Sequence, residues 1–285
     1  MLGAFLCFSI MDTSAKWLVS AAVPALQVAW LRYVGHFFIA SAIYLPKHGR
    51  RILVSGNVRL QMLRAMLLVF ATALNFTALQ FLPLTITIAI FFVVPLTVCL
   101  LSVPILGEQV GLKRLMAVLV GFCGVLVIVQ PWSESFNPYV FISIAAMMCT
   151  SGYFIMSRVV AGMDRNSTTQ MYISGMGTIC LAPPALVFWT WPTSVDAWIL
   201  FCVIGTLGMV GHSMVAFAHQ HAQASVLAPT VYSQVVFIAI LSWVVFGQPP
   251  DAATISGTAI IVSSGLYIWF RERQLTAAVA LAERA

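Results

Sequence analysis

A long uncharged stretch follows the turn at Phe81–Pro83 and constrains the chain more than any other feature. No charged residue occurs from Leu84 to Ile105, and the run closes at Gly107-Glu108. Roughly 20 residues at ~1.5 Å each cross a hydrocarbon core ~30 Å thick. The stretch therefore predicts a membrane-spanning helix.

The outline of this stretch returns later in the chain. The pairs are Ala78-x-Gln80 with Ala218-x-Gln220, Thr85-Ile86 with Ser225-Val226, Leu101-Ser102 with Leu241-Ser242, and Gly107-Glu108 with Gly247-Gln248. Turn, apolar run and glycine boundary recur in the same order. The match predicts two halves built on one plan.

The composition is that of a polytopic membrane protein. Apolar residues make up 61% of the 285 residues, charged residues only 8%, and the mean hydropathy is +0.99. A soluble domain carries about 25% charged residues. The net charge of +6 lies in short loops beside apolar segments, so we expect a lipid bilayer and no nucleic acid as partner.

Hydropathy predicts ten apolar segments joined by short loops. They are Leu2–Ser20, Leu26–Leu45, Leu60–Gln80, Leu84–Ile105, Leu112–Val129, Tyr139–Ala161, Thr168–Trp189, Ala197–His219, Ser225–Phe246 and Ala252–Phe270. Loops this short join antiparallel neighbours and leave no room for a domain outside the membrane. We expect an all-α membrane protein with ten transmembrane helices.

The basic residues predict the orientation. Apart from Lys16 and Arg32, they fall on one side of a ten-helix arrangement: Lys47, Arg50, Arg51, Arg59, Arg64, Lys113, Arg114, Arg158, Arg165, Arg271, Arg273 and Arg284. The loops of the other side hold Glu134, Asp196 and Asp251 but no Lys or Arg. The positive-inside rule then places both termini in the cytoplasm.

Ten helices in two halves give an odd number per half, so the second half enters the membrane from the opposite side. We expect an inverted five-helix repeat, with residues 1–135 and 136–270 as the two units and 271–285 as a cytoplasmic tail. Secondary transporters with such repeats bind substrate near the midplane, between the halves. We expect a central cavity walled by segments one, three, four, six, eight and nine, with segments five and ten at the periphery.

Several local features resemble the EamA-type drug/metabolite transporter superfamily. They are Pro95 with Gly107-Glu108 in segment four, Gly121-x-x-Gly124 in segment five, Asp12-x-x-x-Lys16 in segment one and Gln27-x-x-x-x-Arg32 in segment two. Two features depart from the pattern: Gln248 stands where Glu is usual, and segment nine has no proline that matches Pro95.

The chain is similar in general character to bacterial exporters of amino acids, including aromatic ones. The resemblance implies a secondary transporter of the bacterial inner membrane that exports neutral or aromatic amino acids by alternating access. The alternative is uptake of a vitamin or nucleotide-like metabolite. The substrate is then a small molecule; a monomer is favoured, and the oligomeric state stays open.

Three charged residues inside predicted helices are the leading candidates for the substrate site. Asp12 and Lys16 share one helix face, and Arg32 lies about two turns into segment two. Two cations against one carboxylate leave an excess positive charge, which would suit a substrate carboxylate. The alternative is that Lys16 and Arg32 reach the outer headgroups while Asp12 neutralises Lys16.

Uncharged candidates are of three kinds. The amides are Asn75, Gln80 and Gln234, the aromatic residues are Trp17, Phe76, Tyr153 and Tyr232, and the hinge candidates are Pro95 and Pro229. Amides also join helices to one another without a substrate, aromatic rings also serve as packing, and prolines also make static kinks.

The sequence lacks the motifs that an enzyme would need. It contains no H-E-x-x-H, no G-x-S-x-G, no G-x-x-x-x-G-K-[ST] phosphate loop and no C-x-x-C pair. We therefore expect no catalytic residue, no metal site and no cofactor.

Overall fold

The computed structural model describes residues 1–106, 112–130, 132–133, 136–221, 230 and 232–282. These residues form helices and no strand. The helices are α1 (Leu2–Ser20), α2 (Ala25–His48), η1 (Gly49–Leu53), α3 (Val58–Phe81), α4 (Leu84–Phe91), α5 (Val94–Leu106), α6 (Leu112–Val129), α7 (Val140–Val159), α8 (Asn166–Val187), α9 (Val195–His221), α11 (Ser233–Phe246) and α12 (Ala252–Ala282).

Six of the described helices are long and apolar enough to cross a membrane. These spans are Leu2–Ser20, Ala25–Leu53, Val58–Phe81, Val140–Val159, Val195–Ala218 and Ala252–Arg271. Shorter apolar helices lie at Leu84–Val98, Leu119–Val129 and Val236–Phe246. The prediction of an all-helical membrane protein is confirmed at this level.

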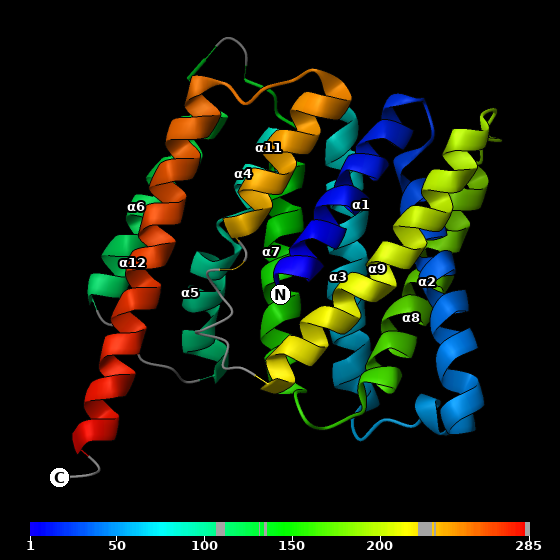
Figure 1. Ribbon diagram of the computed structural model, residues 1–285, viewed down its shortest axis with the longest axis horizontal. Coiled ribbons are helices and arrows are strands. Elements are labelled where there is room, and N and C mark those ends of the chain that lie inside the picture. The colour runs from blue at the N-terminus through cyan, green and yellow to red at the C-terminus, as the bar shows by residue number, and fades with distance from the viewer. Residues whose placement is uncertain (107–111, 131, 134–135, 222–229, 231, 283–285) are drawn as a thin grey trace.

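Helices α1, α2 and α3 alternate in direction. In Figure 1, α1 and α3 end at the upper edge, whereas α2 ends at the lower edge, where α3 begins. Short turns enforce the reversals: Pro24 precedes α2 and Pro83 precedes α4, in positions where a missing N–H costs no helical hydrogen bond. At Gly247, a positive φ of 64° ends α11 in the left-handed conformation that glycine tolerates.

The fourth predicted segment is two helices rather than one. The α4 helix ends at Phe91, and α5 begins at Val94, directly before Pro95. Proline cannot donate a helical hydrogen bond, and its ring crowds the preceding turn. The segment is therefore interrupted just ahead of Pro95, one of the hinge candidates.

The last helix extends beyond its predicted end. The α12 helix continues to Ala282, whereas hydropathy places the end of the segment at Phe270. The sequence RERQLTAAVALA that follows consists largely of strong helix formers. Hydropathy marks where an apolar run ends, and a helix of good propensity can continue past that point.

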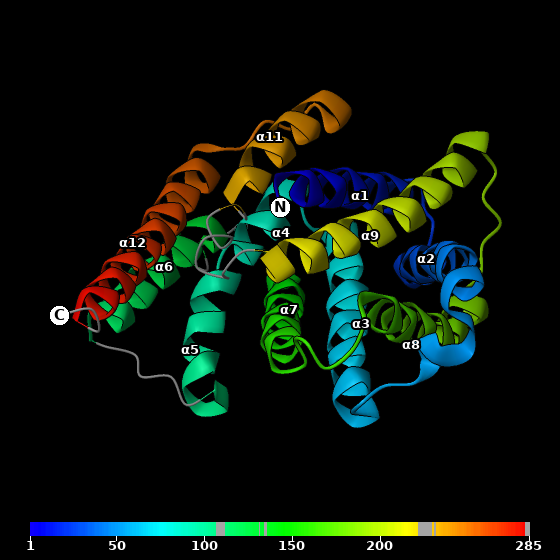
Figure 2. The ribbon, with the colours of Figure 1, turned by 60° about the horizontal axis from the view of Figure 1, so that its bottom comes forward.

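Two helix pairs flank a central group. Figure 2 shows α6 beside α12 at one edge and α2 beside α8 at the other, with α1, α3, α7 and α9 between them. Across the molecule, α3 packs on α7 and α8, and α1 packs on α9 and α11. A close crossing joins α2 to α9, where a Cβ added to Gly35 would lie 3.0 Å from the Cα of Gly205.

Candidate functional site

Polar side chains converge in the interior, among α1, α2, α3, α7 and α9. We call this group the central polar cluster; it comprises Asp12, Arg32, Arg64, Thr72, Asn75, Tyr153 and His212. Charged side chains are rarely buried without partners, because desolvation of an unpaired charge is costly. The arrangement of these partners defines what the cluster can do.

Arg32 lies at the centre of the cluster and is only 2% exposed. Its guanidinium donates to Thr72 Oγ1 at 2.8 Å and contacts His212 Nε2 at 2.9 Å and Met11 Sδ at 3.2 Å. Guanidinium groups only donate, so Nε2 of His212 is the acceptor and the imidazole proton sits on Nδ1. The neutral ring of His212 then faces Tyr153, whose hydroxyl is 3.5 Å from Nδ1.

Asp12 and Lys16 do not pair, contrary to the expectation from their spacing. The Asp12 carboxylate is 6% exposed and accepts a long hydrogen bond of 3.4 Å from Asn75 Nδ2. Lys16 Nζ instead donates to the carbonyls of Leu79 at 2.6 Å and Leu82 at 2.9 Å. The last carbonyls of a helix lack partners in the helix itself, and a cation there also offsets the helix dipole.

The alternative in which Lys16 and Arg32 reach the headgroups is also wrong. Lys16 binds the end of α3, and Arg32 is enclosed by protein. The positive charge of Lys16 is therefore used inside the fold, and the buried excess charge comes from another residue.

That residue is Arg64, one of the basic residues expected on the cytoplasmic side. It is 6% exposed, and its Nε donates to Ser157 Oγ at 2.6 Å while Nη2 donates to Tyr153 Oη at 3.2 Å. Its guanidinium carbon lies 4.9 Å from the centroid of the Tyr153 ring, a cation–π distance. With Arg32, it gives the cluster two guanidinium groups and one carboxylate.

The spacing of residues in the sequence indicates that Arg64 lies on the buried face of a helix. Gln61, Arg64, Leu68, Thr72 and Asn75 follow one another at steps of three or four and are all buried. Such steps place side chains on one face of a helix. The α3 helix starts at Val58, capped by Asn57, so Arg64 already lies inside it.

Some polar atoms of the cluster have no protein partner. Two are buried: Nη1 of Arg64 donates no hydrogen bond, and Oδ1 of Asn75 accepts none, within the described part of the chain. Buried polar atoms are nearly always satisfied, so orphaned ones need an explanation. A donor and an acceptor stand ready here for a polar ligand.

The remaining candidates from the sequence lie outside this cluster. Phe76 is buried in the apolar core, and Gln80 is exposed at the end of α3. Tyr232 packs near Phe92, with ring centroids 6.3 Å apart, and against Gly265. Gln234 lies in the first turn of α11. Pro229 lies outside the described residues.

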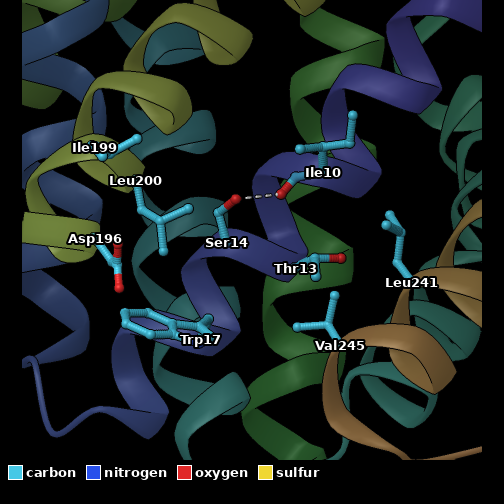
Figure 3. Close-up of a pocket in the computed structure, with 9 residues that line it drawn as sticks. All are labelled: Ile10, Thr13, Ser14, Trp17, Asp196, Ile199, Leu200, Leu241 and Val245. Atoms are coloured by element: carbon cyan, nitrogen blue, oxygen red, sulfur yellow. Dashed lines mark hydrogen bonds between the residues drawn. The ribbon is translucent and has the colours of Figure 1, made fainter.

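A groove of about 400 Å³ opens between α1, α9 and α11 (Figure 3). Its lining residues are Ile10, Thr13, Ser14, Trp17, Asp196, Ile199, Leu200, Leu241 and Val245. These three helices are among those expected to wall a cavity, and neither α6 nor α12 contributes a lining residue. Of the aromatic candidates, Trp17 lies here.

Comparison with known families identifies the class. The profile of the EamA-like transporter family matches residues 1–130 and again residues 137–270. The chain therefore belongs to the EamA-like transporter family. It is a membrane transporter and not an enzyme. Its apolar helices and its interior polar cluster are consistent with this class.

Three curated relatives show the range of cargo in similar proteins. The chain is 27% identical to the S-adenosylmethionine uptake transporter of Rickettsia prowazekii over 93% of its length and 90% of the relative's. It is 28% identical to the riboflavin transporter of Vibrio cholerae, with coverage of 94% and 91%. It is 25% identical to the pseudopaline exporter of Pseudomonas aeruginosa, with coverage of 90% and 89%.

A solved crystal structure supports the fold. It superposes on this chain with a TM-score of 0.67 at 16% identity, covering 96% of this chain and 98% of the other. At that identity the likeness concerns the fold alone.

Proposed function

We propose that this chain is a secondary transporter that takes up a vitamin or nucleotide-like metabolite across a bacterial inner membrane. The observation that carries the proposal is the central polar cluster, which joins helices of both family matches around buried, partly unpaired donors and acceptors. Relatives matched over about nine-tenths of their length are named for S-adenosylmethionine uptake and for riboflavin transport. Uptake is thus better supported than amino-acid export, which was expected from the general similarity of the sequence to bacterial amino-acid exporters.

The proposal includes ten spans arranged as two inverted repeats, 1–135 and 136–270, with both termini in the cytoplasm. In this arrangement α4 and α5 form one broken span, and α1, α2, α3, α4–α5 and α6 correspond to α7, α8, α9, α11 and α12. The packing supports this correspondence, because several packed helix pairs have packed counterparts when the halves are exchanged. The pair α1–α9 corresponds to α7–α3, the pair α2–α9 to α8–α3, and the pair α1–α11 to α7–α5. The pairs α2–α8 and α6–α12 map onto themselves. A twofold axis in the membrane plane has this effect.

The cluster is proposed to hold the polar groups of the substrate. Arg32 and Arg64 offer guanidinium donors, Asp12 offers an acceptor, and the ring of Tyr153 offers a face for stacking. A heterocycle with a polar tail needs this combination of fixed polar groups and aromatic surface.

Amino-acid export remains the second candidate. Nη1 of Arg64, a buried donor with no partner among the described residues, would bind a substrate carboxylate well. The relative named as a pseudopaline exporter indicates that export occurs among similar proteins.

Transport into proteoliposomes tests the proposal. Purified protein is reconstituted, and the entry of labelled S-adenosylmethionine, riboflavin, phenylalanine and leucine is measured with and without a pH gradient. We expect saturable transport of S-adenosylmethionine or riboflavin above protein-free vesicles. Transport restricted to the amino acids would replace the proposal with the second candidate, and transport of none of the four would contradict both.

A further inference from the structure

The groove between α1, α9 and α11 presents a different face of α1 from the central polar cluster. Ile10, Thr13, Ser14 and Trp17 recur at helical steps along the groove, whereas Asp12 is turned toward α3 through Asn75. About 400 Å³ is within the usual range for a site that takes a metabolite. The groove is thus a separate space large enough for a small molecule.

The charge of the groove is negative. Asp196 is exposed and is the only charged residue among those that line it. Figure 3 shows the Asp196 carboxylate beside the indole of Trp17, with Leu200 above and Val245 across the groove. A carboxylate next to an aromatic face selects for a cation, which both groups attract.

The position of Asp196 in the first turn of α9 offers a simpler reason for its presence, since carboxylates stabilise helix N-termini. However, the cap of this helix is made by Ser194, whose Oγ accepts a hydrogen bond from the backbone N–H of Ala197 at 3.2 Å. Among the described residues, no side chain or N–H donates to the Asp196 carboxylate. It is therefore available to a ligand.

The groove walls complete the recognition surface. Ile10, Ile199, Leu241 and Val245 supply apolar contacts. The hydroxyls of Thr13 and Ser14 donate to the carbonyls of Ser9 and Ile10 within α1, which leaves their oxygens able to accept. The groove offers acceptors, an anion and a planar aromatic face, but no cationic donor.

We propose that this groove binds a metabolite with a cationic group and a planar ring, with its positive group between Asp196 and Trp17. The assignment rests on the proposed function and narrows its substrate class. S-adenosylmethionine, a sulfonium joined to an adenine nucleoside, has this chemistry, whereas riboflavin is uncharged. In the proposed orientation the groove lies toward the outside, where a substrate for uptake arrives.

Binding measurements on the full chain test this assignment. The protein is placed in lipid nanodiscs, and the Kd of labelled S-adenosylmethionine and of riboflavin is measured for the wild type and for Asp196→Asn, Trp17→Phe and Trp17→Leu. We expect Asp196→Asn to weaken S-adenosylmethionine binding about tenfold and to leave the riboflavin Kd unchanged. Trp17→Phe should retain most of the affinity, and Trp17→Leu should lose it, because leucine has no aromatic face.

Asp251→Asn is the matched control. It removes one exposed carboxylate near the start of α12, and asparagine caps a helix as well as aspartate does, so the hydrogen bond to the Thr254 N–H is kept. This control should bind S-adenosylmethionine like the wild type. Raising the salt concentration should weaken binding in the wild type and the control more than in Asp196→Asn.

The outcomes separate this inference from the proposed function. If S-adenosylmethionine or riboflavin is transported but the Kd values of Asp196→Asn and Trp17→Leu equal those of the wild type, the groove assignment is overturned and the transport function stands. A groove filled by a lipid acyl chain gives that same result. If none of the metabolites is transported, the proposed function fails, and loss of S-adenosylmethionine binding in Asp196→Asn would still support the groove as a cation site.

Discussion

At the residue scale, the stability of the central polar cluster depends on a small number of hydrogen bonds to each charged group. Arg32 satisfies Thr72 and His212 from one guanidinium, and no other cation of the described residues contacts either group. A buried acceptor that loses its donor costs about 1–3 kcal/mol. Removal of Arg32 therefore disturbs two buried partners at once.

Arg32→Met is expected to lower substrate uptake at least tenfold. The methionine keeps part of the apolar stem but removes the guanidinium hydrogen bonds to Thr72 and His212. Initial rates in proteoliposomes measure the effect, with Arg59→Met, which removes an exposed cation near the start of α3, as the control. Normal uptake by a correctly folded Arg32→Met protein would remove Arg32 from the transport site.

Lys16 is expected to matter for stability and not for substrate affinity. In Lys16→Met, the carbonyls of Leu79 and Leu82 lose their donor, at a cost of about 1–3 kcal/mol. Thermal unfolding in detergent should shift to lower temperature, while the KM for uptake stays the same. Lys16→Arg should recover part of the stability, and a raised KM with unchanged unfolding would instead make Lys16 a substrate ligand.

The sequence led to part of this cluster. Asp12, Arg32, Asn75 and Tyr153 were candidates, and the structure brings them together. Arg64 was missed because it lies near the end of an apolar run. The sequence there reads the same whether the helix places the cation in water or inside the protein. His212 was not among the candidates, since a single histidine carries no signal until the helix opposite supplies Arg32.

At the element scale, the helix positions follow from solvation, and their ends follow from local chemistry. A backbone in hydrocarbon must satisfy its own hydrogen bonds, so apolar runs predict helices well. The break between α4 and α5 was readable from Pro95. The extension of α12 to Ala282 was not, because helix propensity acts independently of hydropathy.

The crossing of α2 and α9 is expected to tolerate no side chain. In Gly205→Ala the new Cβ would lie 2.9 Å from the Cα of Gly35, which forces the backbones apart at a cost of about 1–3 kcal/mol. Gly175→Ala in α8 is the matched control, since its Cβ would meet only the Phe37 ring at 3.8 Å. Thermal unfolding in detergent compares them; equal stability of the two variants would show that the crossing is looser than described.

At the scale of the whole molecule, contacts join the two family matches at both ends of the bundle. At the end where α3 begins, Asp164 accepts hydrogen bonds from Ser55 Oγ at 2.6 Å, the Gly56 N–H at 2.9 Å and Gln61 Nε2 at 2.8 Å. At the other end, Gln27 Nε2 donates to the Thr190 carbonyl at 2.8 Å. Alternating access would require these contacts to open in turn.

The contact at Asp164 is expected to depend on pH. Burial raises the pKa of this carboxyl, but the hydrogen bonds from Ser55, Gly56 and Gln61 outweigh burial and hold its pKa below the ordinary value. A carboxyl with a lowered pKa stabilises the fold above its unfolded pKa of about 4, and that stabilisation is lost as the pH falls through the folded value. The wild type should therefore unfold at higher temperature than Asp164→Asn at about pH 6, and the gap should shrink as the pH falls below about 4. A gap that widens toward acid pH would contradict this assignment.

The glycine crossing also bears on how the halves can move. Gly35 and Gly205 bring two backbones together with no side chain between them, and they belong to different family matches. Interlocked side chains resist rotation because each must leave its hole, whereas two bare backbones in contact can turn about one another with little steric penalty. The crossing therefore has the mechanical character of a fulcrum: it fixes the distance between α2 and α9, while side-chain contacts elsewhere on these helices, such as the Arg32–His212 hydrogen bond, hold the angle between them.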